Sequence, residues 1–287
     1  MTATVWTDLS DRSSVADNAL NFAARFWFVI AVMGQWIFVT YVAVFYGGAA
    51  ARGDLNAWNK VIAHSYVPGR TFSNAATAIH LLLAVVIMVG GPLQLIPAVR
   101  RRLPSFHRWN GRIYLPAVIL TSIAGVYMVW SRGRGNGLVP RLGITLDAAL
   151  IVLFAILTLR YALMRNLSTH RRWALRVFMV VNAGWFFRVG LMQWLFLNHG
   201  PAGFDPETFT GPFINFMSFA DYLLPLVLLE LHLWAKDRGS AIGRLSVATV
   251  LLVMTLGMGI GIFAATLGMW IPHMKAPQHT AVKGAAQ

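Results

Sequence analysis

Long, unbroken runs of apolar residues recur along this chain, separated by short segments that are polar and mostly basic. Each run is about 20 residues long, the length at which an α-helix rising 1.5 Å per residue crosses roughly 30 Å of hydrocarbon. The runs are solid and do not alternate in short segments as the strands of a membrane β-barrel do. We therefore predict an all-α, polytopic bundle with about seven spanning helices, near residues 25–47, 76–98, 110–131, 143–164, 173–197, 213–235 and 246–271.

The short connections between the runs indicate a single membrane domain, from residue 21 to residue 273. We expect the polar tails on either side of it, residues 1–20 and 274–287, to be disordered. The first run exceeds the roughly 7–15 apolar residues of a cleaved signal peptide and no A-x-A cleavage site follows it, so we interpret it as an uncleaved anchor. The longest outer loop, residues 48–74, has room for a turn around Trp58.

The composition agrees with a membrane protein. Of the 287 residues, 57% are hydrophobic and only 12% are charged, whereas a soluble domain averages about 45–50% apolar and 25% charged residues. The polar residues are therefore too few to cover a water-soluble globule. The chain has no cysteine, which excludes disulfides, thiolate metal ligands, iron–sulfur clusters and cysteine nucleophiles.

The formal net charge of +14 is explained by the placement of the basic residues along the chain. If the N-terminus lies in the cytoplasm, fifteen of the 24 Lys and Arg residues lie on the cytoplasmic side and eight on the opposite side. This asymmetry follows the positive-inside rule, which predicts a cytoplasmic N-terminus and an external C-terminus. We expect the basic residues to contact lipid phosphates, and we expect no nucleic-acid partner.

Two of the predicted helical hairpins carry similar sequences. The first contains GPLQLIPAVRRRLPSFHRWNGRIY and the second contains STHRRWALRVFMVVNAGWFFR. In each, the second helix begins with His-Arg, a nearby Trp and another Arg at the next turn. The repetition agrees either with a duplication or with an independent preference for basic and aromatic residues where a helix enters the membrane.

These stretches resemble a family of bacterial multi-spanning membrane proteins of unknown function. Its recurring features are a Gly-Pro-Leu-Gln helix end, an HRxxGRxY helix start and an HRRWxxR helix start, and the resemblance covers roughly residues 76–190. It implies a multi-pass protein of the bacterial inner (cytoplasmic) membrane, and it implies no activity.

A more distant similarity, to di-haem cytochrome b membrane proteins, draws attention to the histidines. In those proteins four consecutive helices each supply one histidine to a haem. His107 and His170 begin the third and fifth predicted helices at a similar depth, so the similarity implies that they ligate the iron of one haem b. Arg108 and Arg172 would then bind its propionates. The alternative is that each His-Arg-x-Trp segment anchors its helix at the lipid headgroups.

Ionisable residues inside the predicted helices indicate a polar cluster, and this inference is independent of any resemblance. Arg188 lies about sixteen residues into the fifth run, where an unpaired Arg costs roughly 2.5–3.5 kcal/mol to insert. We expect it to pair with Asp221, or otherwise with Asp147, and a structural ion pair is the alternative to a binding site. Glu230 and His232 with Arg176 predict a smaller cluster toward the cytoplasm. The intramembrane candidates are His80, Asp147, Arg188, Asp221, Glu230 and His232.

Three functions remain open. The chain is a haem b-binding electron-transfer subunit of a bacterial respiratory or quinone-linked system, a cofactor-free carrier or sensor built on the polar cluster, or a structural subunit of a membrane complex. The partners that these functions imply are the lipid bilayer, quinone and other subunits. The sequence has no GxxxxGK[ST], HExxH, GxSxG or EF-hand pattern that would indicate another chemistry.

Overall fold

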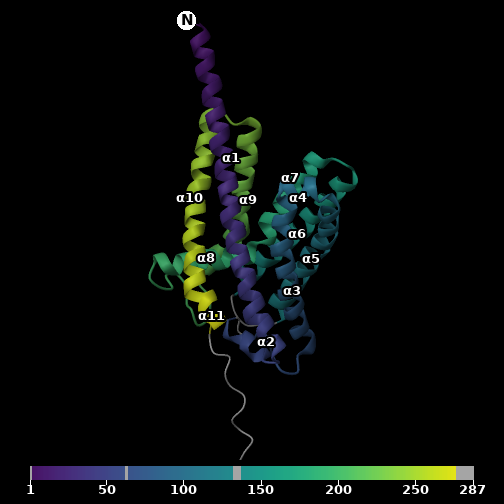
Figure 1. Cartoon of the computed structure of the whole chain (residues 1–287). Helices are drawn as coiled ribbons and strands as arrows, with labels where there is room; N and C mark the ends of the chain where they lie inside the picture. Colours follow the sequence, from purple (N-terminus) through teal and green to yellow (C-terminus); the bar gives the residue numbers. More distant parts are fainter. Residues whose placement is uncertain (1, 62–63, 132–136, 276–287) are drawn as a thin grey trace, which may run out of the picture.

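The computed structural model describes residues 2–61, 64–131 and 137–275, with side chains from residue 14 onward (Figure 1). Its elements in these ranges are helices, apart from an isolated β-bridge between Asp205 and Thr210. Six of the described helices are long and apolar enough to span a membrane, and one bent helix pair raises the number to seven. The predicted all-α bundle of about seven spans is thus confirmed. The side of the membrane on which the N-terminus lies stays a prediction.

The six long helices follow the predicted runs, and some extend beyond them. Two of them continue through π-helical segments into short terminal helices: α1 passes through η1 (Val42–Gly47) into α2 (Gly48–Ala51), and α10 through η3 (Thr266–Trp270) into α11 (Ile271–Lys275). A 3₁₀ turn, η2 (Leu55–Lys60), and α4 (Pro97–Arg102) lie in the connections. The long helices are α1 (Thr2–Tyr41), α3 (Thr71–Leu95), α5 (Pro104–Ser131), α6 (Leu138–Leu163), α9 (Pro212–Arg238) and α10 (Ala241–Ala265).

The two expected tails lie at the margins of the described chain. α1 begins at Thr2, so residues 2–20 have a helical backbone in this structure. Most of the C-terminal tail, from residue 276, lies outside the described residues. The disorder of both tails stays a prediction.

The fifth predicted helix consists of two helices, α7 (Leu167–Val181) and α8 (Ala183–Leu197), bent by 50°. Asn182 lies between them, and its side-chain amide donates a hydrogen bond of 2.7 Å to the carbonyl oxygen of Phe178. The carbonyl of Asn182 in turn accepts from the backbone N–H groups of Trp185 and Phe186, each at 2.9 Å. Short polar side chains that bond to nearby backbone groups in this way favour helix ends over helix interiors. The bend redirects α8 and every side chain that it carries.

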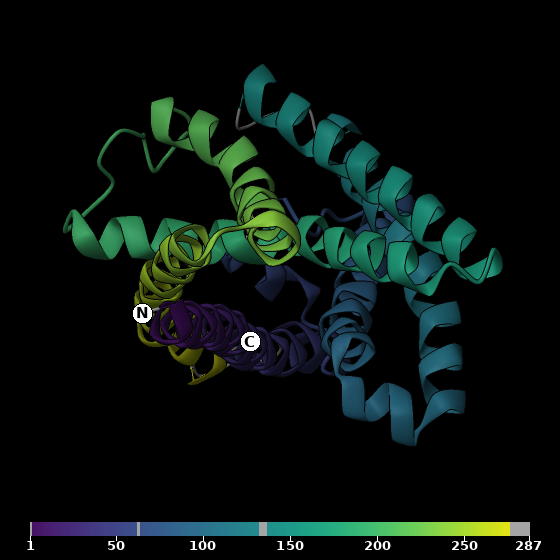
Figure 2. The same ribbon diagram turned by 90° about the horizontal axis from the view of Figure 1, so that it is seen from above.

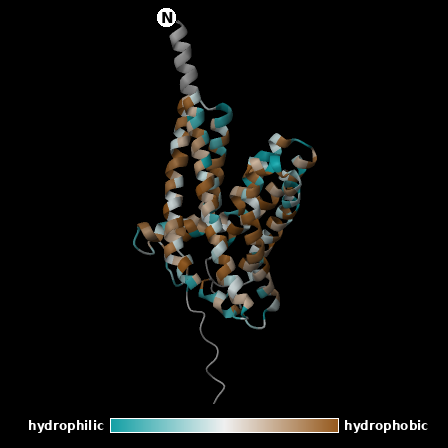
Figure 3. Cartoon of the chain, in the orientation of Figure 1, coloured by the Kyte–Doolittle hydropathy of each residue, from teal (hydrophilic) through white to brown (hydrophobic). Residues whose placement is uncertain are grey.

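The helices form two groups that share contacts through α6, α7 and α9 (Figure 1). α1 packs along α10, with α9 beside them, while α3, α5, α6 and α7 follow one another as neighbours. α8 crosses against α9 and α10, and Figure 2 shows α7 and α8 reaching across the molecule when it is seen from above. Hydrophobic residues cover the long helices, and hydrophilic ones gather toward the helix ends and loops (Figure 3). We call the end where α1 begins the N-terminal end.

The hairpin of α3 and α5 explains part of the sequence signature. The amide of Gln94 donates a hydrogen bond of 2.9 Å to the carbonyl oxygen of His107, and that of Asn110 donates one of 2.9 Å to the carbonyl oxygen of Gly90. A Cβ atom at Gly90 would meet the side chain of Asn110, so glycine permits this close approach. The GPLQ helix end and the HRWNGR helix start are thus hydrogen-bonded to each other.

Candidate functional site

The predicted ion pair between Arg188 and an aspartate is wrong. Arg188 lies on α8, where its guanidinium donates to the carbonyl oxygen of Gly184 and lies 5.4 Å from the ring centre of Phe38 in α1. No carboxylate in the described part of the chain lies within the 4.0 Å of an ion pair with it. The bend at Asn182 accounts for the error, because it turns this part of the fifth run toward α1.

The two aspartates predicted as ion-pair partners of Arg188, Asp147 and Asp221, lie close to each other. α6 crosses α9 where Gly143 packs against the backbone of Ser218, and Asp147 and Asp221 follow about one turn later on their helices. The two carboxyl groups are near enough to interact electrostatically. The Oδ1 atom of each is buried and accepts no hydrogen bond in the structure. The crossing therefore forms a pair of buried carboxyl groups.

Tyr222 completes this arrangement, and sequence analysis did not find it. Its side chain is 0% exposed, and its hydroxyl group has no hydrogen-bond partner. The hydroxyl interacts electrostatically with both Asp147 and Asp221. Its position next to Asp221 in the sequence was the available signal. We call Asp147, Asp221 and Tyr222 the carboxyl site.

His80 takes another position. Its Nδ1 atom lies 3.2 Å from the carbonyl oxygen of Thr121 in α5, and its ring lies near Gly125 of the same helix. The structure thus brings together Asp147 and Asp221 of the predicted outer cluster and places Arg188 against α1.

The smaller predicted cluster forms at the N-terminal end, where α7 meets α9. Arg176 binds Glu230 through two hydrogen bonds of 2.6 and 2.8 Å. Arg172 binds Asp237 in the same two-pronged way, at 2.8 and 2.7 Å. The Nδ1 atom of His232 is buried nearby without a hydrogen-bond partner. A hollow of about 200 Å³ lies between the helices and is lined by Arg172, Glu230, Leu233, Trp234, Asp237 and Arg238.

His107 and His170 occupy equivalent positions in their hairpins. Each is the fourth residue of its helix, and each backbone N–H donates to the carbonyl oxygen four residues earlier, at 3.0 Å for His107 and 2.9 Å for His170. The two side chains are near enough to interact electrostatically. The Nδ1 atom of His170 lies 2.9 Å from the carbonyl oxygen of Thr158, and that of His107 is buried without a partner.

The two arginines expected to bind haem propionates form other interactions, one an ion pair and the other a single hydrogen bond. Arg172 is bound to Asp237, and Arg108 donates only to the hydroxyl oxygen of Ser105, at 3.1 Å. Among the described residues there is no group of three or more His, Asp and Glu side chains that could hold a metal ion. A site built from two histidines is not addressed by that observation, so haem ligation stays a prediction.

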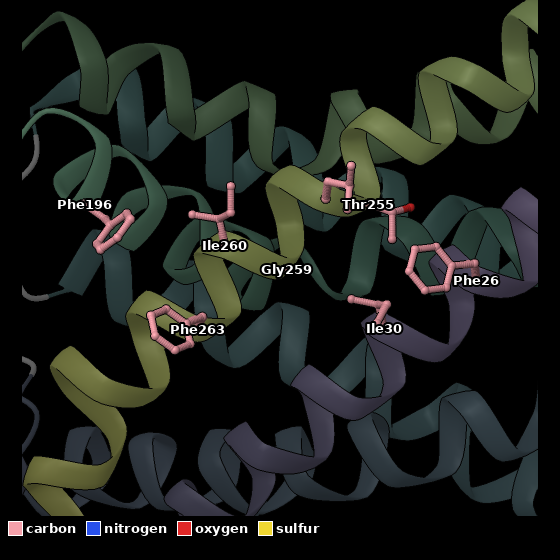
Figure 4. Close-up of a pocket in the computed structure, with 8 residues that line it drawn as sticks. Phe26, Ile30, Phe196, Thr255, Gly259, Ile260 and Phe263 are labelled. Atoms are coloured by element: carbon pink, nitrogen blue, oxygen red, sulfur yellow. The ribbon is translucent and has the colours of Figure 1, made fainter.

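A larger hollow lies on the outside of the bundle and has a different chemical character. It has a volume of about 350 Å³, and its lining comes mainly from α1 and α10 (Figure 4). Thr255 is the single polar residue in this lining, and its hydroxyl group donates to the carbonyl oxygen of Leu251 at 2.6 Å. The hollow therefore offers an apolar surface without a titratable group. Its lining residues are Phe26, Ile30, Phe196, Thr255, Leu256, Gly259, Ile260 and Phe263.

Comparison with known proteins agrees with a membrane location. Residues 77–206 match the model of a family described as "Predicted membrane protein (DUF2306)". No curated protein and no solved structure matches the chain. The matched region runs from α3 through α8 and contains both hairpins, His107, His170 and Asp147, while Asp221 lies beyond it. The chain is thus an integral, multi-spanning membrane protein that is similar, over this region, to a family of predicted membrane proteins.

Proposed function

We propose that this protein is a proton-linked membrane carrier in which Asp147 and Asp221 take up and release a proton. The observation that supports this proposal is the pairing of two buried carboxyl groups across α6 and α9, neither of which forms an ion pair with a cation of the described residues. Ionisable residues within spanning helices are costly, and they commonly mark ion pathways and proton relays.

The chemistry of such a pair favours a shared proton. An unpaired carboxylate is expensive to bury in apolar surroundings. Two adjacent carboxyl groups also repel each other when both are ionised, so one of them holds a proton under conditions in which an exposed carboxyl group has lost it. The unpartnered hydroxyl of Tyr222 is a donor that is available to the group that remains charged.

The location of the pair links its protonation to helix packing. α6 and α9 belong to different groups of helices, and they approach closely at Gly143 and Ser218. Loss of the shared proton would place two negative charges one turn from this contact. Repulsion between them would then favour a conformation in which the helices separate or a cation enters, which is how a local charge change shifts a conformational equilibrium.

Infrared difference spectroscopy tests for the shared proton. In purified protein labelled with ¹³C-aspartate, we expect the carbonyl band of a protonated carboxyl group at neutral pH. Asp147→Asn together with Asp221→Asn should remove this band, and each single change should shift it. The matched control is Asp205→Asn, because this labelled carboxylate lies exposed in the loop before α9 and should contribute no such band.

Proton movement is measured in vesicles that contain the purified protein and a trapped pH-sensitive dye. After an external acid pulse, we expect Asp147→Asn and Asp221→Asn each to slow proton entry by about tenfold or more, since each removes a proton acceptor. Absence of a protonated carboxyl band at neutral pH would contradict the proposal. Proton entry that the Asn variants leave unchanged would contradict it as well.

A second candidate function is electron transfer in a quinone-linked system, by a subunit that binds one haem b between His107 and His170. The observation that favours it is the approach of these two side chains from equivalent positions on α5 and α7. The contact of the His170 Nδ1 atom with the Thr158 carbonyl would fix the ring and leave Nε2 available, as in other histidine ligands. A haem held there would supply one-electron redox chemistry.

An absorption spectrum of the detergent-purified protein, before and after reduction with dithionite, tests this second function. We expect sharp haem b bands that are lost in His107→Ala and in His170→Ala. His199→Asn is the control, because this histidine lies in the loop after α8 with a φ of 54°, a conformation that asparagine tolerates. Colourless protein would exclude the haem and would leave the carrier proposal untouched.

A further inference from the structure

A second unbalanced group lies near α2 and α11, at the end of the bundle opposite the N-terminal end (Figure 1). Arg188 lies near enough to the hydroxyl groups of Tyr41 and Tyr46 for a favourable electrostatic interaction. The ring of Trp270 stacks at 6.4 Å from that of Tyr41 and lies 5.3 Å from that of Phe38, over which Arg188 also lies. We call Arg188, Tyr41, Tyr46 and Trp270 the donor cluster.

The donor cluster contains buried hydrogen-bond donors and an arginine, and no charged acceptor among the described residues. Tyr41 is 1% exposed and Trp270 is 0% exposed, and the Trp270 indole nitrogen has no hydrogen-bond partner in the structure. The Tyr41 hydroxyl interacts with the hydroxyl group of Tyr46 and meets no charged acceptor among the described residues. Arg188 donates one N–H to the carbonyl oxygen of Gly184 and pairs with no carboxylate among the described residues. Burying a hydrogen-bond donor without an acceptor costs free energy. A negatively charged acceptor bound at the donor cluster would recover it.

The backbone around the donor cluster is also unusual. Tyr46 lies within the π-helical segment η1, and Trp270 ends the other π-helical segment, η3. Single π-helical turns within α-helices occur frequently at functional sites, because they re-aim side chains. The indole of Trp58 donates to the carbonyl oxygen of Tyr46 at 3.1 Å and holds the outer loop against this segment.

We propose that Arg188, together with the hydroxyl group of Tyr41 and the indole N–H of Trp270, binds an oxyanion. Its source is either the carboxylate of a small molecule or the phosphate of a lipid. Guanidinium groups suit both, because their parallel N–H groups match two oxygens of one anion. Arg188 is partly exposed and provides the approach, while the buried Tyr41 and Trp270 provide the inner donors. The proposal does not depend on the carboxyl site, which shares no residue with it.

The test uses the full-length protein in detergent and two probes. Binding of benzoate is followed by tryptophan fluorescence, and retention of phosphatidylglycerol is followed by native mass spectrometry. We expect Arg188→Gln to weaken binding of the occupying probe by about 10-fold or more, and Tyr41→Phe to weaken it by a similar factor, since each removes a hydrogen bond to a charged group. Arg188→Lys keeps the positive charge, so it should weaken binding of the probe less than Arg188→Gln does.

Arg141→Gln is the matched control, because this arginine also lies over an aromatic ring, that of Trp130 at 5.9 Å, and has no part in the donor cluster. Benzoate binding identifies a small carboxylate as the ligand class, and retained phosphatidylglycerol identifies a lipid phosphate. Folding of each variant is checked by its thermal unfolding, and Tyr41→Phe supplies the test if Arg188→Gln does not fold. The proposal is overturned if neither probe binds, or if Arg141→Gln weakens binding as much as Arg188→Gln.

Discussion

Ion pairs between described side chains lie at the N-terminal end of the bundle. Arg176 pairs with Glu230 across α7 and α9, and Arg244 of α10 pairs with Asp17 of α1 at 3.0 Å. The side chains of Arg176 and Glu230 are 18% and 46% exposed. Because partly exposed pairs are screened by solvent, they stabilise a protein by only about 0.2–1 kcal/mol each. Their effect here is to fix which helices meet.

Arg176→Ala and Glu230→Ala should show a coupling of about 0.5–1 kcal/mol in a double-mutant cycle of the free energy of unfolding. Arg176→Ala alone should cost more than Glu230→Ala, because the guanidinium also lies 4.5 Å over the ring of Trp173. Thermal unfolding in detergent measures both effects. A parallel cycle between Arg238 and Glu207, for which the structure shows no ion pair, should give no coupling. A coupling near zero for the first pair would show that its geometry does not persist in solution.

At the scale of the helices, close crossings depend on single glycines. Gly143 allows α6 to approach the backbone of Ser218 in α9, and this contact positions the carboxyl site one turn away. Gly261 of α10 meets the backbone of Val189 in α8 in the same manner. Small residues at helix interfaces permit such approaches in membranes, where packing replaces the hydrophobic effect as the source of association.

Gly143→Ala should therefore destabilise the protein by about 1–3 kcal/mol, because the added methyl group overlaps the Ser218 carbonyl and forces the helices apart. It should also alter the infrared band of the carboxyl pair. Gly259→Ala in α10 is the control: its Cβ atom meets nothing within 4 Å, so the better helix propensity of alanine should leave stability unchanged or raise it by up to about 1 kcal/mol. The melting temperatures of both variants in thermal unfolding measure these changes in stability. Equal melting temperatures would mean that the crossing tolerates a wider separation.

At the scale of the whole molecule, the described chain separates two unbalanced polar sites. The carboxyl site lies between α6 and α9, and the donor cluster lies between α1, α8 and the end of α10. Among the described residues, the carboxyl site has no paired cation and the donor cluster has no paired anion. The two proposals together describe a protein that binds a proton or cation at one site and an oxyanion at the other, an arrangement suited to coupled transport.

The bent path of α7 and α8 produces this separation. α8 contacts α9 and α10 after the bend, and Arg188 lies over Phe38 of α1. A straight fifth helix continuing α7 would have placed the same arginine in another part of the bundle. Asn182 is thus the residue at which the two polar sites become distinct.

The sequence by itself determined the properties that depend on hydrophobicity along the chain. The length of each apolar run predicted the spanning helices, because the thickness of a bilayer sets that length. It also predicted that His107 and His170 begin equivalent helices, because both follow short basic segments at the same boundary. The hydrogen bonds that Gln94 and Asn110 donate to backbone carbonyl oxygens across one hairpin join residues that are near in sequence, and both residues belong to a signature that was visible there.

Only the tertiary structure decided which polar side chains meet. Hydropathy gives the depth of Arg188, Asp147 and Asp221 within the membrane, and it gives neither the face of the helix on which each lies nor the neighbour of that face. Those depend on a bend at Asn182 and on the crossing at Gly143, and both are consequences of packing between helices distant in sequence. Depth alone suggested an ion pair, whereas packing placed the two carboxyl groups together and left the arginine among aromatic donors.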